Sequence, residues 1–239
     1  MWDSIEDGTG TAWGWLTTAS SWLFNLAKWL VQRLLGLFDL FLTLLGVMPP
    51  KKLRIRVVIL SNEAREPLAS PAEAASVVQL ATEVFQNEAN TKVVGAEPLV
   101  VTLPVAAPTA ALDVRCGVGV LLDDLGEAGA FFRRHRARSP LGLFFGYGSP
   151  VTVFVVRDIV DARGCSAGLL ADYVTVSVKA LAGSDGMKLT LAHEVAHACD
   201  LPHLWGAATL MEHQPGPRTH SLSRWQKAIF RSSPHVTYG

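Results

Sequence analysis

Residues 193–203 read HEVAHACDLPH, and this stretch decides which fold we expect. Side chains four residues apart lie on one face of a helix, so His193 and His197 point the same way. Two imidazoles at this spacing can bind one zinc ion at about 2.0–2.1 Å. Glu194 lies beside them, and its carboxylate can take a proton from a water whose pKa zinc lowers to about 7. The stretch therefore predicts a helix that carries a metal site.

A third histidine, His203, makes this prediction more specific. It follows His197 by six residues, which on a continued helix would place it on the other side. The helix must therefore end, and the chain must turn back. Asp200 stands where the turn belongs, and Pro202 prevents the helix from continuing. Three histidines leave one coordination position open, which is typical of a catalytic zinc site.

The pattern resembles that of the metzincin clan of zinc peptidases, His-Glu-x-x-His-x-x-Gly-x-x-His followed by a methionine turn. His193, Glu194, His197 and His203 of this chain match the histidines and the glutamate of that pattern position by position. Met211 ends the run Thr-Leu-Met eight residues after His203, a spacing similar to that of the matrix-metalloproteinase branch. The chain departs from the clan at Asp200, which stands at the glycine position. Aspartate adopts the left-handed conformation expected there more readily than most residues do.

The resemblance implies an α/β (α+β) fold, with a twisted mixed sheet, an active-site helix and a C-terminal helix. It also implies a cleft between two subdomains, where an extended peptide binds along an edge strand. By analogy, this strand would contain Cys165, Ser166, Ala167 and Gly168. The activity implied is that of a zinc metallopeptidase acting on a peptide or protein, with Glu194 as general base.

From the order of the expected strands and helices, we predict that residues 51–239 form one domain. Residues 151–159, VTVFVVRDI, are the clearest strand because they are dense in β-branched side chains. Ser70 followed by Pro71 marks the start of a helix. We expect strands at 53–60, 99–103, 116–122, 151–159 and 173–178, an edge segment at 164–170, and helices at 71–89, 125–138, 186–199 and 222–232.

Residues 1–50 differ from the rest, and we expect them to form a separate membrane-associating helical region. Residues 29–48 are mostly apolar, and twenty helical residues span about 30 Å, the thickness of a bilayer core. Tryptophans, which favour membrane interfaces, are concentrated here. Five of the seven in the chain are Trp2, Trp13, Trp15, Trp22 and Trp29.

A polar stripe leaves three interpretations of this helix open. It could cross a membrane with the stripe against partner helices, lie in the interface, or dock on another protein. We expect it to contact lipid or partner membrane helices through residues 13–48 as a single span. Acids precede it and bases follow, which would place the C-terminal domain on the cytoplasmic side. The stripe consists of Asn25, Lys28, Gln32, Gly36, Asp39 and Thr43.

Charge and cysteine content exclude other classes of protein. Lysine plus arginine equals aspartate plus glutamate, 21 each, and no basic stripe occurs, so we expect no nucleic-acid partner. Cys116, Cys165 and Cys199 show no Cys-x-x-Cys spacing, and their odd number fits no complete disulfide framework. We expect buried free thiols, while one bridge between two of the three stays open.

Three functions are compatible with these residues. The first is a membrane-associated zinc metalloendopeptidase. The second is a catalytically silent or partner-activated subunit that keeps the zinc fold and scaffolds a membrane protein assembly. The third is zinc-dependent hydrolysis of a non-peptide amide, which the sequence does not separate from proteolysis.

Overall fold

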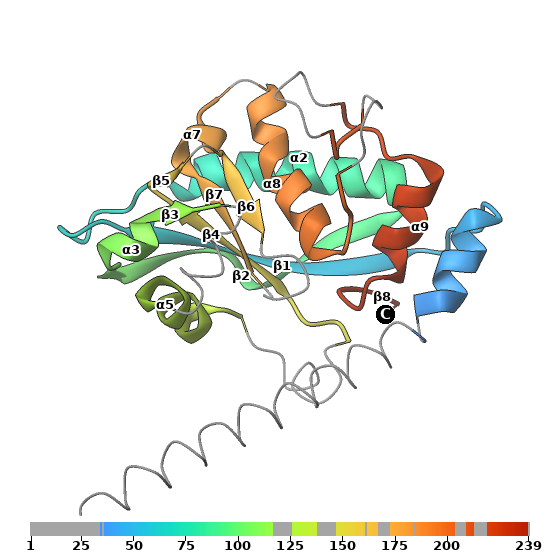
Figure 1. Ribbon diagram of the computed structural model, residues 1–239, viewed down its shortest axis with the longest axis horizontal. Helices are drawn as coiled ribbons and strands as arrows, with labels where there is room; N and C mark the ends of the chain where they lie inside the picture. The colour runs from blue at the N-terminus through green and yellow to red at the C-terminus, as the bar shows by residue number, and fades with distance from the viewer. Residues whose placement is uncertain are drawn as a thin grey trace, which may run out of the picture.

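The main sheet of this mixed α/β fold is mostly parallel, with strand order β2-β1-β4-β7-β6 (Figure 1). Strand β6 lies at one edge and runs antiparallel to β7, while β8 pairs with the start of β1. The computed structural model describes residues 34, 36–116, 126–137, 147–160, 162–166, 173–183, 185–203, 209–212 and 219–238. The strands are β1 (Lys51–Ser61), β2 (Thr91–Ala106), β4 (Val151–Val156), β6 (Gly164–Ser166), β7 (Tyr173–Ser177) and β8 (Val236–Thr237).

Two hydrophobic cores lie on the two faces of this sheet. Successive side chains of a strand point to opposite faces. In β1, Leu53, Ile55 and Val57 therefore join one core, while Val58 and Leu60 join the other. Every residue of β4 is buried, as expected for a central parallel strand covered on both sides.

Helices cover both faces (Figure 1). On one face lie α2 (Pro71–Ala89) and α8 (Asp185–Ala198), and on the other α3 (Thr109–Leu112) and α5 (Glu127–His135). Helix α2 begins with a capping box, in which Ser70 and Glu73 each satisfy the other's backbone N–H. Two further helices, α7 (Val178–Leu181) and α9 (Arg224–Ser232), precede α8 and the C-terminus.

The structure confirms the expected fold class and most of the expected elements. The strand expected at 151–159 is instead two strands, because the chain bends at Arg157 and β5 (Asp158–Val160) leaves the sheet to pair with β3 (Asp113–Arg115). The strand expected at 99–103 is part of the longer β2. Residues 117–122 of another expected strand lie outside the described residues.

The N-terminal region requires a correction. Within the described part of the chain, no helix is both long and apolar enough to cross a membrane. This finding overturns the expected single-pass, membrane-associated location with a cytoplasmic C-terminal domain. Residues 1–33 and 35, including most of the expected contact region 13–48, lie outside the described residues.

The described part of the polar stripe instead contacts the same chain. A helix runs over residues 36–44, and its Gly36, Asp39 and Thr43 are buried. Nζ of Lys51 lies 2.6 Å from Oδ2 of Asp39 and 2.7 Å from the carbonyl oxygen of Arg231. Burial lowers the pKa of Lys51, and its hydrogen bond to Asp39 opposes that shift. The described part of the stripe, Gly36, Asp39 and Thr43, therefore contacts the C-terminal segment of the same chain.

Arg231 completes this contact from α9. Its guanidinium is fully buried, and it donates to Oγ1 of Thr43 at 3.2 Å and to the carbonyl of Pro49 at 2.6 Å. Gly36 allows the close approach, because a Cβ there would collide with the carbonyl oxygen of Ser232. Tyr238 donates to the second oxygen of Asp39. The helix is thus fixed to the domain through polar groups.

The opposite face of the same helix is exposed. Its large apolar side chains are 55–67% accessible to solvent, although they follow the spacing of a helix face that normally packs on a core. In Figure 1 the helix, coloured blue, lies beyond α9 at the outer side of the molecule. These residues are Leu37, Phe38 and Phe41 on the helix, together with Leu34 before it and Leu45 after it.

Candidate metal centre

Helix α8 carries the first two predicted ligands. His193 is 2% exposed, and His197 is partly buried one turn later on the same face. Leu191, Val195 and Ala196 of the same helix lie in the core that covers the sheet. Core packing thus fixes the rotation of the helix, and the histidines keep the common direction expected from their spacing.

The end of α8 turns the chain back toward these histidines. The N–H of Leu201 donates to the carbonyl of Ala196 at 3.1 Å, and the N–H of Asp200 donates to that of His197 at 2.9 Å. These two bonds form a Schellman motif, which requires a left-handed residue and usually has glycine there. Asp200 takes that position with φ of 71°. The motif brings His203 back to the helix face.

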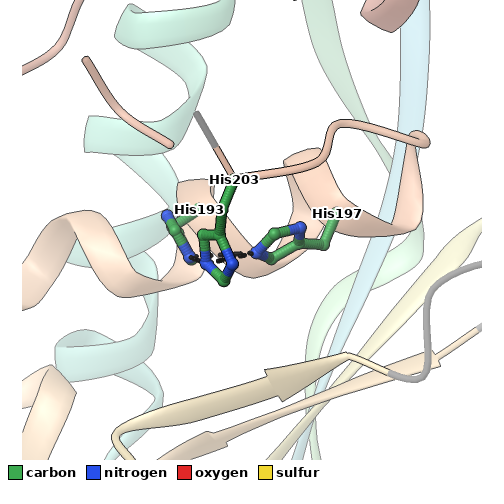
Figure 2. Close-up of side chains that lie close together, drawn as sticks. All are labelled: His193, His197 and His203. Atoms are coloured by element: carbon green, nitrogen blue, oxygen red, sulfur yellow. Dashed lines mark hydrogen bonds between the residues drawn. The ribbon is translucent and has the colours of Figure 1, made fainter. Parts of the chain in front are cut away.

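Three imidazole nitrogens converge as a result (Figure 2). The Nε2 atoms of His193 and His197 are 3.1 Å apart, and that of His203 lies 3.2 Å and 3.1 Å from them. Ligands at 2.0–2.1 Å around a tetrahedral zinc ion would be separated by about 3.3 Å. The three nitrogens therefore fit one zinc ion, and within the described residues this is the cluster that could hold a metal.

Two backbone carbonyls fix the tautomers of the two histidines on α8. Nδ1 of His193 lies 2.7 Å from the carbonyl oxygen of Leu210, and Nδ1 of His197 lies 2.6 Å from that of Leu201. A carbonyl oxygen only accepts, so Nδ1 carries the proton in both rings and Nε2 presents a lone pair. Two lone pairs at 3.1 Å repel one another unless a cation lies between them. The donor set thus suits a metal chemically as well as geometrically.

Met211 lies directly after the carbonyl that orients His193. It is fully buried in the core beside α8, and the preceding Leu210 is buried with it. The N–H of Glu212 donates to the carbonyl of Thr209 at 3.2 Å, which closes a tight turn over 209–212. Nε2 of Gln226, on α9, donates to Oγ1 of Thr209 at 3.2 Å. This turn therefore orients His193 through the carbonyl of Leu210.

Glu194 is buried against the edge of the sheet. It is 5% exposed, and Gly164 of strand β6 lies against its side chain. Cys165 and Ser166, two of the residues expected along a bound peptide, belong to the same edge strand. Ala167 and Gly168, the other two, lie outside the described residues. The sheet edge thus adjoins the predicted base.

The cysteines follow the alternative that sequence reasoning left open. Cys116 and Cys165 form a disulfide, with Cα atoms 5.6 Å apart, so the expectation of free thiols is wrong for these two. Cys199 is free and fully buried, and burial raises the pKa of its thiol well above the usual value. It follows directly after α8 and packs in the core.

A separate cavity of about 780 Å³ shares no residue with the histidine cluster. It lies where the end of β2 meets α3 and α5, on the other face of the sheet. Its chemistry is mixed, with two carboxylates and two basic side chains around an apolar floor. The lining residues are Glu63, residues 105–109, Glu127, Ala130, Phe131, Arg134 and His135.

Comparisons place the chain beside several solved structures, although no protein-family profile and no curated sequence matches it. Mature mirolysin from Tannerella forsythia, in complex with a cleaved peptide, is similar at 15% identity with a TM-score of 0.49, over 77% of this chain and 91% of that one. Metalloproteinase-II from Bacteroides fragilis is similar at 14% identity and a TM-score of 0.47, over 76% and 53%.

Archaemetzincin from Methanopyrus kandleri is similar at 16% identity and a TM-score of 0.39, over 76% of this chain and 88% of that one. All three identities are below 25% and all three TM-scores are below 0.5. The function proposed below is therefore derived from the residues of this chain.

The sequence predicted the three histidines that the structure brings together, but not the groups that orient two of them. The carbonyls of Leu201 and Leu210 act through their backbone, so no side-chain pattern marks them. Gly164 and the disulfide partner of Cys165 were also missed, because a single sequence shows neither close approach nor pairing. For Gly164, the available signal was a glycine directly before Cys165, the first residue expected along the bound peptide.

Proposed function

We propose that this chain is a zinc-dependent metalloendopeptidase in which His193, His197 and His203 hold the metal. Glu194 is the general base of the proposed reaction. The observation that carries the proposal is the convergence of three Nε2 atoms at 3.1–3.2 Å, two of them with tautomers fixed by backbone carbonyls. Three neutral nitrogens leave one coordination position open for chemistry.

Zinc, when bound, polarises a carbonyl group and makes water easier to deprotonate near neutral pH. The chain's own residues supply the rest. The carboxylate of Glu194 accepts the proton of the attacking water and passes it to the leaving amine. Its burial keeps bulk water away, which strengthens the interactions of that charge with the reacting groups.

Peptide binding is assigned to the edge of the sheet. Among the described strands, β6 pairs on one side only, with β7. An extended peptide can add to such an edge through backbone hydrogen bonds. A substrate bound along Cys165 and Ser166 would lie next to the strand residue that contacts Glu194, which supports a peptide over a compact amide as substrate.

A second candidate is a zinc-binding subunit that does not hydrolyse peptides by itself. The exposed apolar face of residues 34–45 favours it, because large exposed apolar patches mark interaction sites. Such a protein would keep the metal and show no turnover alone.

The test is zinc stoichiometry of the full-length chain beside His203→Ala, together with cleavage of a mixed peptide library. The full length is needed, because removing residues 1–50 would leave Lys51 buried without Asp39. We expect one zinc per wild-type chain, weakened binding in the variant, and cleavage that a chelator stops. His220→Ala, which changes an exposed histidine outside the cluster, is the matched control and should retain both properties.

The outcomes separate the candidates. One zinc without cleavage would favour the second candidate. Wild-type protein that binds no zinc would refute the proposed site itself.

A further inference from the structure

The base Glu194 stands against a strand residue that has no side chain. A Cβ placed on Gly164 would lie 2.6 Å from Oε1 of Glu194 and closer still to its Cγ. Real Cβ atoms essentially never show contacts under 3.0 Å. The crowded atom Cγ belongs to the middle of the glutamate side chain, so a small swing of the carboxylate alone would not relieve the collision. Any larger residue at this position must displace Glu194 or the strand.

Strand β6 is held in place more firmly than a free edge strand. It pairs with β7 from Gly164 to Ser166, and the N–H of Ser177 donates to the carbonyl of Arg163 at 2.9 Å. Oγ1 of Thr175 donates to the carbonyl of Cys165 at 3.3 Å. Retreat of the strand would break this ladder.

The disulfide adds a covalent anchor one residue away. Cys165 directly follows Gly164 and is bonded to Cys116, which comes directly after β3. Helix α8 and β6 contact one another, and Figure 1 shows them side by side. The pairing with β7 and the bridge thus hold the strand whose Gly164 lies against the side chain of Glu194.

From this arrangement we infer that Gly164 is a positioning residue for Glu194, and that the Cys116–Cys165 bridge keeps it there. The inference rests on the proposed function, since it concerns the placement of the base. Because retreat of the strand would break its pairing with β7, an added methyl group would push the carboxylate aside by about 1 Å, from 2.6 Å to the ordinary contact distance of 3.4–4 Å. Misplacement of this size lowers turnover by roughly 10²-fold in enzymes.

The first test is Gly164→Ala, with kcat, KM and zinc stoichiometry measured on the full-length protein. We expect kcat to fall about 10²-fold, with KM and zinc content unchanged. Gly183→Ala is the matched control, because Gly183 precedes α8 and its Cβ would collide with Met187 of that helix instead of with Glu194. It should lower the melting temperature without the loss in kcat. Equal kcat losses in both variants would overturn the inference.

Coupling to Glu194→Asp distinguishes positioning from general damage. The shorter aspartate withdraws from Gly164, so adding Gly164→Ala to Glu194→Asp should cost less than about 3-fold, well below its cost alone. A merely structural role predicts that the two losses multiply.

A measurement that does not depend on turnover is the Kd of acetohydroxamate for the zinc-loaded protein. This probe binds zinc through two oxygens and offers a proton that a correctly placed carboxylate accepts. Gly164→Ala should weaken it about 10-fold or more, as Glu194→Gln should, because a charge-assisted hydrogen bond is lost. Gly183→Ala should not.

Turnover and acetohydroxamate affinity together distinguish failure of the proposed peptidase activity from failure of the positioning role of Gly164. Wild-type protein that cleaves nothing while its acetohydroxamate affinity depends on Gly164 would refute the peptidase and support the positioning. Cleavage with normal kcat and normal acetohydroxamate affinity in Gly164→Ala would refute the positioning alone. Absence of zinc from the wild-type protein would refute both.

Discussion

Two helices of this protein carry polar side chains at helical spacing, but the two sets of side chains have different partners. On α8, His193 and His197 direct lone pairs toward one another and toward His203. On the helix over residues 36–44, Asp39 faces the ammonium group of Lys51 and the hydroxyl of Tyr238. Both sets are largely buried. The first brings imidazole nitrogens together around a point where a metal ion could lie, whereas the second pairs a carboxylate with an ammonium group of the same chain.

The difference shows how a structural polar cluster can be told from a binding site. Buried polar groups are normally satisfied by the protein itself. A cluster that brings acceptor atoms together, with the N–H groups of two rings already used elsewhere, is suited to bind a cation from solution. A cluster in which ammonium, carboxylate and hydroxyl meet is complete. Sequence spacing alone does not separate the two, because both have the period of a helix.

The largest expected effect concerns the α8 site. Glu194→Gln should keep one zinc per chain and lower peptide hydrolysis by roughly 10²–10⁴-fold, because the amide cannot take up the water's proton. Glu83→Gln, the same change at an exposed position of α2, is the control and should leave turnover unchanged. Metal analysis and peptide cleavage provide the measurements. Turnover that survives in Glu194→Gln would remove this residue from the mechanism.

The next effect concerns the N-terminal contact. Lys51→Ala should lower the free energy of unfolding by about 3–5 kcal/mol, because it leaves Asp39 buried without its cation. Urea denaturation of zinc-loaded protein would measure this. Lys52→Ala, at the partly exposed neighbouring position, should cost less than about 1 kcal/mol.

An apolar replacement of both charges sharpens the same test. Asp39→Leu combined with Lys51→Met should recover most of the stability, as replacement of buried ion pairs often does. If Lys51→Ala alone costs no more than Lys52→Ala, the N-terminal helix is not fixed by this pair in solution.

The smallest effect concerns the turn that brings His203 to the other two histidines of the candidate metal site. Asp200→Gly should raise the free energy of unfolding by about 0.5–1 kcal/mol, since glycine adopts a positive φ without steric cost. Asp200→Ala should lower it by a similar amount. Zinc affinity should stay within about 2-fold in Asp200→Gly. A large loss of affinity would mean that the aspartate side chain, and not only its backbone, supports the site.

Prediction of the fold from sequence succeeded where patterns were local. The β-branched run from residue 151 and the proline-led helix at Pro71 lie where expected. It failed at Arg157, where the chain changes sheets, because the partner of β5 is β3, more than forty residues earlier. The single bridge between Cys116 and Cys165 was equally invisible, since only the fold brings these residues together.

The sequence by itself predicted which three histidines come together and where the chain turns between them. Their geometry follows from helix period and backbone preference, which act over a few residues. Only the tertiary structure decided which groups meet Asp39 and Glu194. Tyr238 lies 199 residues from Asp39, and Gly164 belongs to a different strand. The reason is physical: helical period shows which residues share a face, but packing of distant segments decides whether that face meets a charge of its own chain or a ligand from outside.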